Sequence, residues 1–174
     1  MKKLGMCALA AWALSCAAAQ PMPARKPGLW EVAIVGGQGA ASRPVTVQQC
    51  TDRASDAQVL LSIVPGQEHC GAPTVHRQGR RYRIENQCAV HGRRLNLQME
   101  LSGDLQARYE GSYEVLPERA AGGPPPEARR FEARWLGECR PGMQPGDMVL
   151  PNGITVQVLK QPHGSVHADG HHHD

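Results

Sequence analysis

The chain has 174 residues and a nearly balanced charge, with 19 Lys and Arg against 16 Asp and Glu. Its length suits one domain with a single modest core. A nucleic-acid-binding protein is expected to carry a strong basic excess, and this chain has none. Only 4% of the residues are aromatic, so we expect the core to need reinforcement beyond the burial of large rings.

The amino-terminal residues have the three parts of a secretory signal peptide. Lys2 and Lys3 precede an apolar run of about a dozen residues, and small residues follow it. We expect cleavage after Ala19, which ends an Ala-x-Ala pattern, and a periplasmic or secreted product. The run is too short for a transmembrane helix, which needs about 20 apolar residues. The alternative is lipoprotein processing at Cys16, which would tether the same domain to a membrane by acyl chains.

Four cysteines follow the signal segment, namely Cys50, Cys70, Cys88 and Cys139. An even number in an oxidising compartment predicts two disulfides, and three pairings are open. We favour Cys50 with Cys70 and Cys88 with Cys139, because the first pair would bracket a short helical segment. Each bridge is worth about 3–4 kcal/mol. A metal site is the competing interpretation, and the lack of a Cys-x-x-Cys spacing argues against it.

The first half of the chain predicts two strands and one helix. Residues 29–35 place Trp30, Val32 and Ile34 on one face of a strand, and residues 45–50 form a second strand. Residues 51–64 have apolar residues at helical spacing instead. Ser55-Asp56-Ala57-Gln58 predicts a capping box at the start of this helix, and Pro65-Gly66 ends it.

From residue 74 onward, short runs alternate between apolar and polar residues. Strands are expected over residues 80–88, 95–101, 105–115 and 131–135, with a short one over residues 154–159. The turns are expected at Gln78-Gly79, His91-Gly92 and Ser102-Gly103-Asp104. Because such short links exclude parallel crossovers, the expected fold is mainly β, an antiparallel meander or open barrel-like sheet with one short helix and two disulfides. One face of the sheet should be buried against the rest of the domain, and the other should be exposed to solvent.

The chain thus divides into a signal peptide at residues 1–19, an exported β domain at residues 26–153 and a His-rich tail at residues 160–174. The tail has no apolar periodicity, and we expect it to be disordered. Its histidines could hold Cu(II), Ni(II) or Zn(II) as a labile site, and the predicted ligands are His167, His171, His172 and His173. The competing interpretation is a solvated tail that binds metal only opportunistically.

A Pro-Gly-Leu-Trp-Glu run at residues 27–31 and a Gly-Glu-Cys run at residues 137–139 frame the cysteines of the domain. In these residues and in the cysteine spacing, the chain resembles a bacterial exported family, the domain of unknown function 3617. The resemblance covers roughly residues 26–153. It implies the disulfide pairing favoured above, and it carries no established activity.

Charged residues of the predicted strands suggest one further surface. The arginines that could form a basic stripe are Arg80, Arg81, Arg83, Arg93 and Arg94, with Arg129, Arg130 and Arg134 as additional members. Such a stripe could meet anionic lipid or an acidic partner. Glu85, Glu100 and Glu132 are interspersed, so we favour an ordinary polar sheet face.

Catalytic and cofactor-binding signatures are weak. The glycine-rich residues 36–41 lead into a strand and not into the helix that a dinucleotide loop requires. His69, His76 and His91 lie outside any Gly-x-Ser-x-Gly motif, and Glu110 and Glu114 are expected to be solvated. We predict no catalytic or cofactor-binding residue. The expected function is a non-enzymatic binding or structural module of the envelope, and we expect its ligand cleft between the sheet and the helix. The first alternative is a metal-handling protein that uses the tail. The second alternative is a hydrolase.

Overall fold

In the part of the chain that the structure describes, nine strands form one antiparallel sheet, and a short helix packs on it. The computed structural model describes residues 20–36, 43–118 and 128–159. The elements are β1 (Gly28–Val35), β2 (Val45–Thr51), α1 (Asp56–Leu61), the 3-10 helix η1 (Gln67–His69), β3 (Thr74–Gln78), β4 (Arg81–Val90), β5 (Arg93–Asp104), β6 (Arg108–Pro117), β7 (Arg129–Gly137), β8 (Asp147–Val149) and β9 (Thr155–Gln157). Their order across the sheet is β3-β4-β5-β6-β7-β1-β2-β8-β9. The predicted fold class is confirmed.

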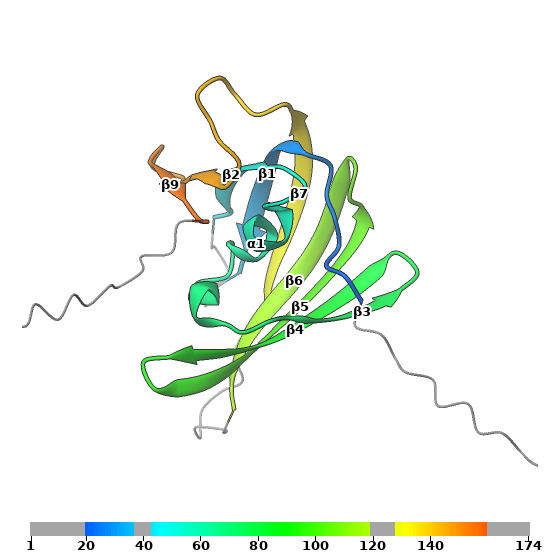
Figure 1. Cartoon of the computed structure of the whole chain (residues 1–174), viewed down its shortest axis with the longest axis vertical. Coiled ribbons are helices and arrows are strands. Elements are labelled where there is room, and N and C mark those ends of the chain that lie inside the picture. The colour runs from blue at the N-terminus through cyan, green and yellow to red at the C-terminus, as the bar shows by residue number, and fades with distance from the viewer. Residues whose placement is uncertain (1–19, 37–42, 119–127, 160–174) are drawn as a thin grey trace, which may run out of the picture.

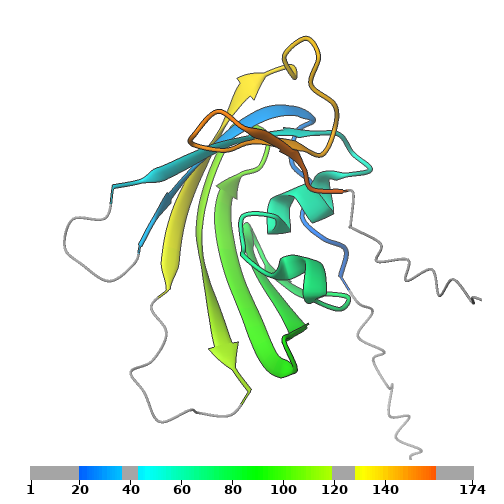
Figure 2. The ribbon, with the colours of Figure 1, turned by 90° about the vertical axis from the view of Figure 1, so that its left-hand side faces the viewer.

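Strands β3 to β7 form the predicted meander, and β1 closes onto its end. Trp30 on β1 faces Trp135 on β7, and Ile34 faces Phe131. The first strand of the chain therefore lies between β7 and β2. Figures 1 and 2 show that the sheet is strongly curved and that α1 and η1 lie on the inner side of the curve.

The inner face of the sheet carries the core. Successive side chains of a strand point to opposite faces, so the apolar residue of each alternating pair turns toward α1. The ring of Tyr109 lies between those of Trp30 and Phe131, with centroid distances of 5.3 and 6.1 Å. Leu60 on α1 and Met99 on β5 are almost completely buried in the same cluster. The space between sheet and helix, where the sequence placed a ligand cleft, is thus filled by core side chains.

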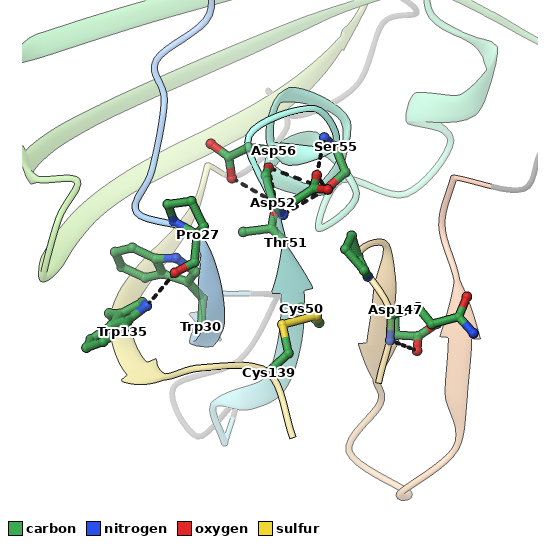
Figure 3. The surroundings of a disulfide bond; sticks show 12 residues. Pro27, Trp30, Cys50, Thr51, Asp52, Ser55, Asp56, Trp135, Cys139 and Asp147 are labelled. Atoms are coloured by element: carbon green, nitrogen blue, oxygen red, sulfur yellow. Dashed lines mark hydrogen bonds between the residues drawn. A yellow bond between two sulfur atoms is a disulfide. The ribbon is translucent and has the colours of Figure 1, made fainter. Parts of the chain in front are cut away.

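The two disulfides join different pairs of cysteines from those predicted. Cys50 pairs with Cys139, and Cys70 pairs with Cys88. Leu29 on β1 is the cross-strand partner of Cys50 on one side and of Gly137 on the other, which brings the end of β7 beside the end of β2. Figure 3 shows the resulting Cys50–Cys139 bridge. The predicted pairing, which the resemblance also implies, is therefore wrong. Only β1 lies between β2 and β7, so Cys50 at the end of β2 is close to Cys139, which follows β7.

The chain after η1 carries Cys70 to β4, on the opposite half of the sheet from Cys50. The chain after η1 passes over β4, where Cys70 and Cys88 form an isolated antiparallel bridge. The helical segment therefore carries Cys70 away from Cys50 and does not return it there.

The helix starts differently from the predicted capping box. The Ser55 side chain makes no capping hydrogen bond to α1. It instead accepts from the backbone N–H of Asp52 at 3.0 Å, while the Asp52 carboxylate accepts from the backbone N–H of Ser55 at 2.8 Å. The reciprocal pair thus forms one turn earlier, because an aspartate carboxylate is a strong acceptor for free N–H groups at a helix start. Hydrogen bonds from Ser55 hold the pKa of Asp52 below its usual value.

Two further boundaries differ from the sequence prediction. Strand β5 continues through the predicted turn at residues 102–104, and the turn lies at residues 105–107 instead. Asp104 causes this shift, since its side chain accepts from Gln106 N at 2.9 Å and its carbonyl accepts from Ala107 N. The predicted last strand is shorter than expected, and it pairs with β8, a strand that the sequence analysis did not predict.

Residues 20–27 form an extended segment that packs on the inner side of the sheet before β1 begins. Pro23 and Arg25 are buried, whereas Ala24 and Pro27 are exposed. The backbone N–H of Lys26 donates to Leu105 O at 2.8 Å. In the described part of the chain, no helix is long and apolar enough to cross a membrane.

Candidate functional site

The outer face of the sheet is polar and is hollowed by a groove of about 1270 Å³. In Figure 2 this face lies on the side of the sheet away from α1, and no described helix covers it. The charged residues that line the groove are Arg77, Arg81, Arg83, Arg130, Glu85, Glu100, Glu110 and Glu132. The groove therefore has as many arginines as glutamates.

Strand register arranges these residues in two rows that cross the sheet. One row consists of Val35, Arg130, Ser112, Glu100, Arg83 and His76, in the order β1, β7, β6, β5, β4, β3. The adjacent row consists of Ala33, Glu132, Glu110, Ser102, Arg81 and Gln78. Since neighbouring strands lie about 4.8 Å apart, each row spans roughly 24 Å. Both rows end on small apolar residues of β1.

Some of the charges in the groove are already paired. Arg83 Nη2 lies 2.8 Å from Glu100 Oε1, and Arg108 Nη2 lies 2.7 Å from Glu132 Oε2. All four side chains are more than half exposed. Exposed pairs of this kind contribute little to stability, typically about 0–1 kcal/mol, so they can exchange partners with a ligand at small cost.

Five other charges in the groove have no described ion-pair partner. They are Arg77, Arg81, Arg130, Glu85 and Glu110, none of which lies within 4.0 Å of an opposite charge among residues 20–36, 43–118 and 128–159. Ser112 lies directly across from Arg130, and Ser102 across from Arg81. The free guanidinium groups and their neighbouring hydroxyls can donate to an anionic group of a ligand, and the carboxylates can accept from a cationic one.

The region beside the groove is held by a further ion pair. Arg134 Nη2 lies 2.8 Å from Glu31 Oε1, and Gln48 Nε2 donates to the other carboxylate oxygen at 3.3 Å. The hydrogen bond from Arg134 holds the pKa of Glu31 below its usual value, and the bond from Gln48 acts in the same direction. This carboxylate links β7, β1 and β2 on the outer face.

Of the arginines considered for a basic stripe, Arg81, Arg83 and Arg130 line the groove, but the set as a whole does not lie together. Arg94 pairs across strands with Ala89, six residues along β4 from Arg83, which places the two arginines roughly 20 Å apart. Arg83 faces Glu100, and Arg94 Nη1 lies 3.7 Å from Glu118 Oε1. The geometry thus favours the polar sheet face over a continuous basic surface.

The histidines and glutamates considered for catalysis lie in separate places. His69 ends η1, His91 lies in the β4–β5 turn, and His76 lines the groove on β3. Glu110 and Glu114 lie on the outer face of β6, opposite the buried Tyr109 and Tyr113, as their alternation predicted. The residues 37–42 and the tail with its four predicted metal ligands lie outside the described part of the chain.

A buried polar cluster on the inner side was missed by the sequence analysis. Arg25 Nε donates to Asp56 Oδ1 at 2.7 Å, and the backbone N–H of Arg25 donates to Asp56 Oδ2 at 2.7 Å. Arg25 Nη1 donates to Gln49 Oε1 at 2.9 Å and to the Tyr109 hydroxyl at 3.1 Å. Burial opposes the charge of Arg25, but Tyr109 and Asp56 outweigh it and raise the arginine pKa. Arg25 stands between Ala24 and Lys26 in a proline-containing stretch, and such a position gives no signal of burial in the sequence.

The residues of the two framing motifs meet at one corner of the sheet. The indole N–H of Trp30 donates to Lys26 O at 2.8 Å, and that of Trp135 donates to Pro27 O at 3.0 Å. Figure 3 shows Trp135 pointing toward Pro27. A Cβ on Gly28 would lie 2.2 Å from Gly137 O, so the two motifs require a glycine at this contact. The motifs therefore stabilise the junction of β1, β7 and β2.

Fold and site together define a small disulfide-linked β domain with one helix-covered face and one polar, grooved face. Residues 25–139 match the model of a family described as "Protein of unknown function (DUF3617)". The chain belongs to this family. No significant match was found among the curated proteins or among the solved structures.

Proposed function

We propose that this chain is an exported, non-enzymatic binding module, cleaved after Ala19, whose ligand surface is the groove on the outer face of the sheet. Two disulfides support a location outside the cytoplasm, because thiols in the cytoplasm are kept reduced. The observation that carries the binding role is the groove, with its free arginines and glutamates set in register on neighbouring strands.

The charge pattern favours a ligand with both signs of charge. Arg130 and Glu110 lie on neighbouring strands in adjacent rows, so a ligand could meet a cation and an anion at the same position along the groove. An extended polypeptide carries such mixed charges, and at about 3.4 Å per residue some seven residues would span a row. We therefore assign a polypeptide segment as the ligand class.

Site-directed photo-crosslinking in the envelope of the producing cell tests this proposal. A photoreactive residue at Ser112, in the groove, should form an adduct with a second polypeptide. The same residue at Glu68, which is 49% exposed on η1 at the other face, should not. The adduct at Ser112 should weaken when Arg81 and Arg130 are both replaced by glutamate.

The control for this charge reversal is Arg53→Glu, an exposed position in the turn before α1. It should leave the adduct unchanged. Adducts at Glu68 and none at Ser112, or equal loss of the adduct in the groove and control variants, would contradict the groove as the ligand surface.

A further inference from the structure

The buried cluster around Arg25 has the form of a binding pocket with its ligand in place. The guanidinium group enters from residues 20–27, while its partners come from four other elements: Trp30 of β1, Gln49 of β2, Asp56 of α1 and Tyr109 of β6. The side chain of Arg25 is 0% exposed and that of Asp56 is 4% exposed. The guanidinium carbon lies 5.7 Å from the centre of the Trp30 ring, within the range of a cation–π contact.

Three of the four walls of this pocket are held in position without the segment that fills it, whereas the indole N–H of Trp30 donates to Lys26 O of that segment. Gln49 Nε2 donates to Val59 O at 2.7 Å and lies 3.0 Å from Ser62 Oγ, which fixes the carbonyl oxygen of its amide toward Arg25. The Thr51 hydroxyl donates to Asp56 Oδ1 at 3.2 Å. The Tyr109 ring is held by its aromatic neighbours. We therefore expect the acceptors to remain in place when the guanidinium group leaves.

The occupying segment is held by few hydrogen bonds in its first residues, and its anchor lies at Lys26 and Pro27, whose carbonyl oxygens accept from the indole N–H groups of Trp30 and Trp135. Residues 20–27 belong to no strand, and Pro21, Pro23 and Pro27 have no backbone N–H to donate. In the described part of the chain, residues 20–24 have no hydrogen bond, and Lys26 makes the segment's single backbone–backbone bond. Arg25 Nη2 is buried without a described hydrogen-bond partner, so the chain's own arginine leaves one donor unsatisfied.

We propose that this pocket is an arginine-recognition site, which the chain fills with its own Arg25 and which accepts an arginine side chain of an extended partner peptide when residues 20–25 withdraw. The pocket selects a guanidinium group because it offers three acceptors in different directions, from Asp56, Gln49 and Tyr109, together with the face of Trp30. A lysine ammonium is a compact point charge and cannot reach all three at once. The site lies on the inner side of the sheet, separate from the outer groove.

A peptide added in trans provides the first test. A fluorescently labelled acetyl peptide with the sequence of residues 21–27 is titrated with the Arg25→Ala variant of the full chain, whose pocket is empty, and followed by fluorescence anisotropy. Its partner peptide carries citrulline, the neutral isostere, at the position of Arg25. The arginine peptide should bind, and the citrulline peptide should bind about 10-fold or more weakly, because the charge-assisted bonds to Asp56 are lost.

The second test empties the pocket within the full chain. Addition of 20 mM N-acetyl-arginine amide to the Arg25→Ala variant should raise its melting temperature by roughly 3–7 °C. The lysine analogue should do less, and neither compound should shift the wild-type chain, whose pocket is occupied. Combining Arg25→Ala with Asp56→Asn should abolish the rise.

If Arg25→Ala does not fold, Arg25→Gln, which removes the charge and keeps a polar side chain, replaces it in both tests. Equal binding of the arginine and citrulline peptides, or no binding of either, would overturn the proposal. If the variant folds, a melting temperature that arginine amide leaves unchanged would overturn it as well. Loss of the outer-groove adduct does not bear on either result.

Discussion

Removal of the Cys50–Cys139 disulfide should destabilise the domain more than removal of Cys70–Cys88. The two bridges close loops of very different size, with sequence separations of 89 and 18 residues. From the loss of loop-closure entropy in the unfolded chain, the Cys50→Ala/Cys139→Ala variant should lose about 4.6 kcal/mol and the Cys70→Ala/Cys88→Ala variant about 3.2 kcal/mol. A domain of this kind is held by about 5–15 kcal/mol, so the first loss removes about a third or more of the total.

Urea unfolding of the two double variants measures the difference between their losses of stability. The free energy of unfolding is taken from the midpoint and from the slope against urea concentration together, because an opened loop also changes this slope. Thiol labelling under denaturing conditions checks the pairing in the same preparations. The wild type and the variant lacking Cys50 and Cys139 should have no free thiol beyond the signal segment, whereas Cys50→Ala/Cys70→Ala should leave two. An equal or reversed loss of stability, or the opposite thiol pattern, would refute the reasoning.

Three further predictions follow from other parts of the molecule. A Cβ on Gly111 would lie 2.2 Å from Glu100 O and 2.6 Å from the Phe131 ring, so Gly111→Ala should lower the free energy of unfolding by about 1–3 kcal/mol. The control is Gly71→Ala, whose added Cβ would have no contact under 3.8 Å, and it should change the free energy of unfolding by less than about 1 kcal/mol. Urea titrations measure both values. Burial raises the pKa of the Tyr109 phenol, so the stability that depends on its neutral form is fully present below about pH 10 and is lost as the pH rises through the raised pKa. Tyr109→Phe should reduce this alkaline loss, and Tyr82→Phe should not, as followed by circular dichroism against pH. In calorimetry with Cu(II) and Zn(II), full-length protein should bind and a version ending at Gln161 should not; equal heats would remove the tail histidines as ligands.

The fold was predictable to the extent that neighbouring residues determine it. Alternation on β1, β5 and β7 identified the inner face, because the side-chain period of a strand depends on the chain itself. The turn after β5 was misplaced, because the prediction relied on Gly103, whereas the turn begins only at Asp104, the last residue of the predicted turn, which accepts from the backbone N–H groups of Gln106 and Ala107.

Features that depend on the packing of distant segments could not be read in this way. The disulfide pairing follows from the insertion of β1 between β7 and β2, which no local pattern near Cys50 or Cys139 encodes. The groove requires the register of six strands. Arg130 and Arg83, for example, lie in one row only because β5 and β6 pair in register between them. Arg25 was missed because its burial depends on Asp56, which lies 31 residues away.

The central claim, that the chain is exported and oxidised before it acts, is tested most directly by the intact mass of the protein recovered from the envelope of its own cells. We predict a chain that begins at Gln20 and is lighter than its fully reduced form by four hydrogen atoms, as two disulfides require. A chain found in the cytosol that retains Met1 and has four reduced thiols at positions 50, 70, 88 and 139 would contradict the account.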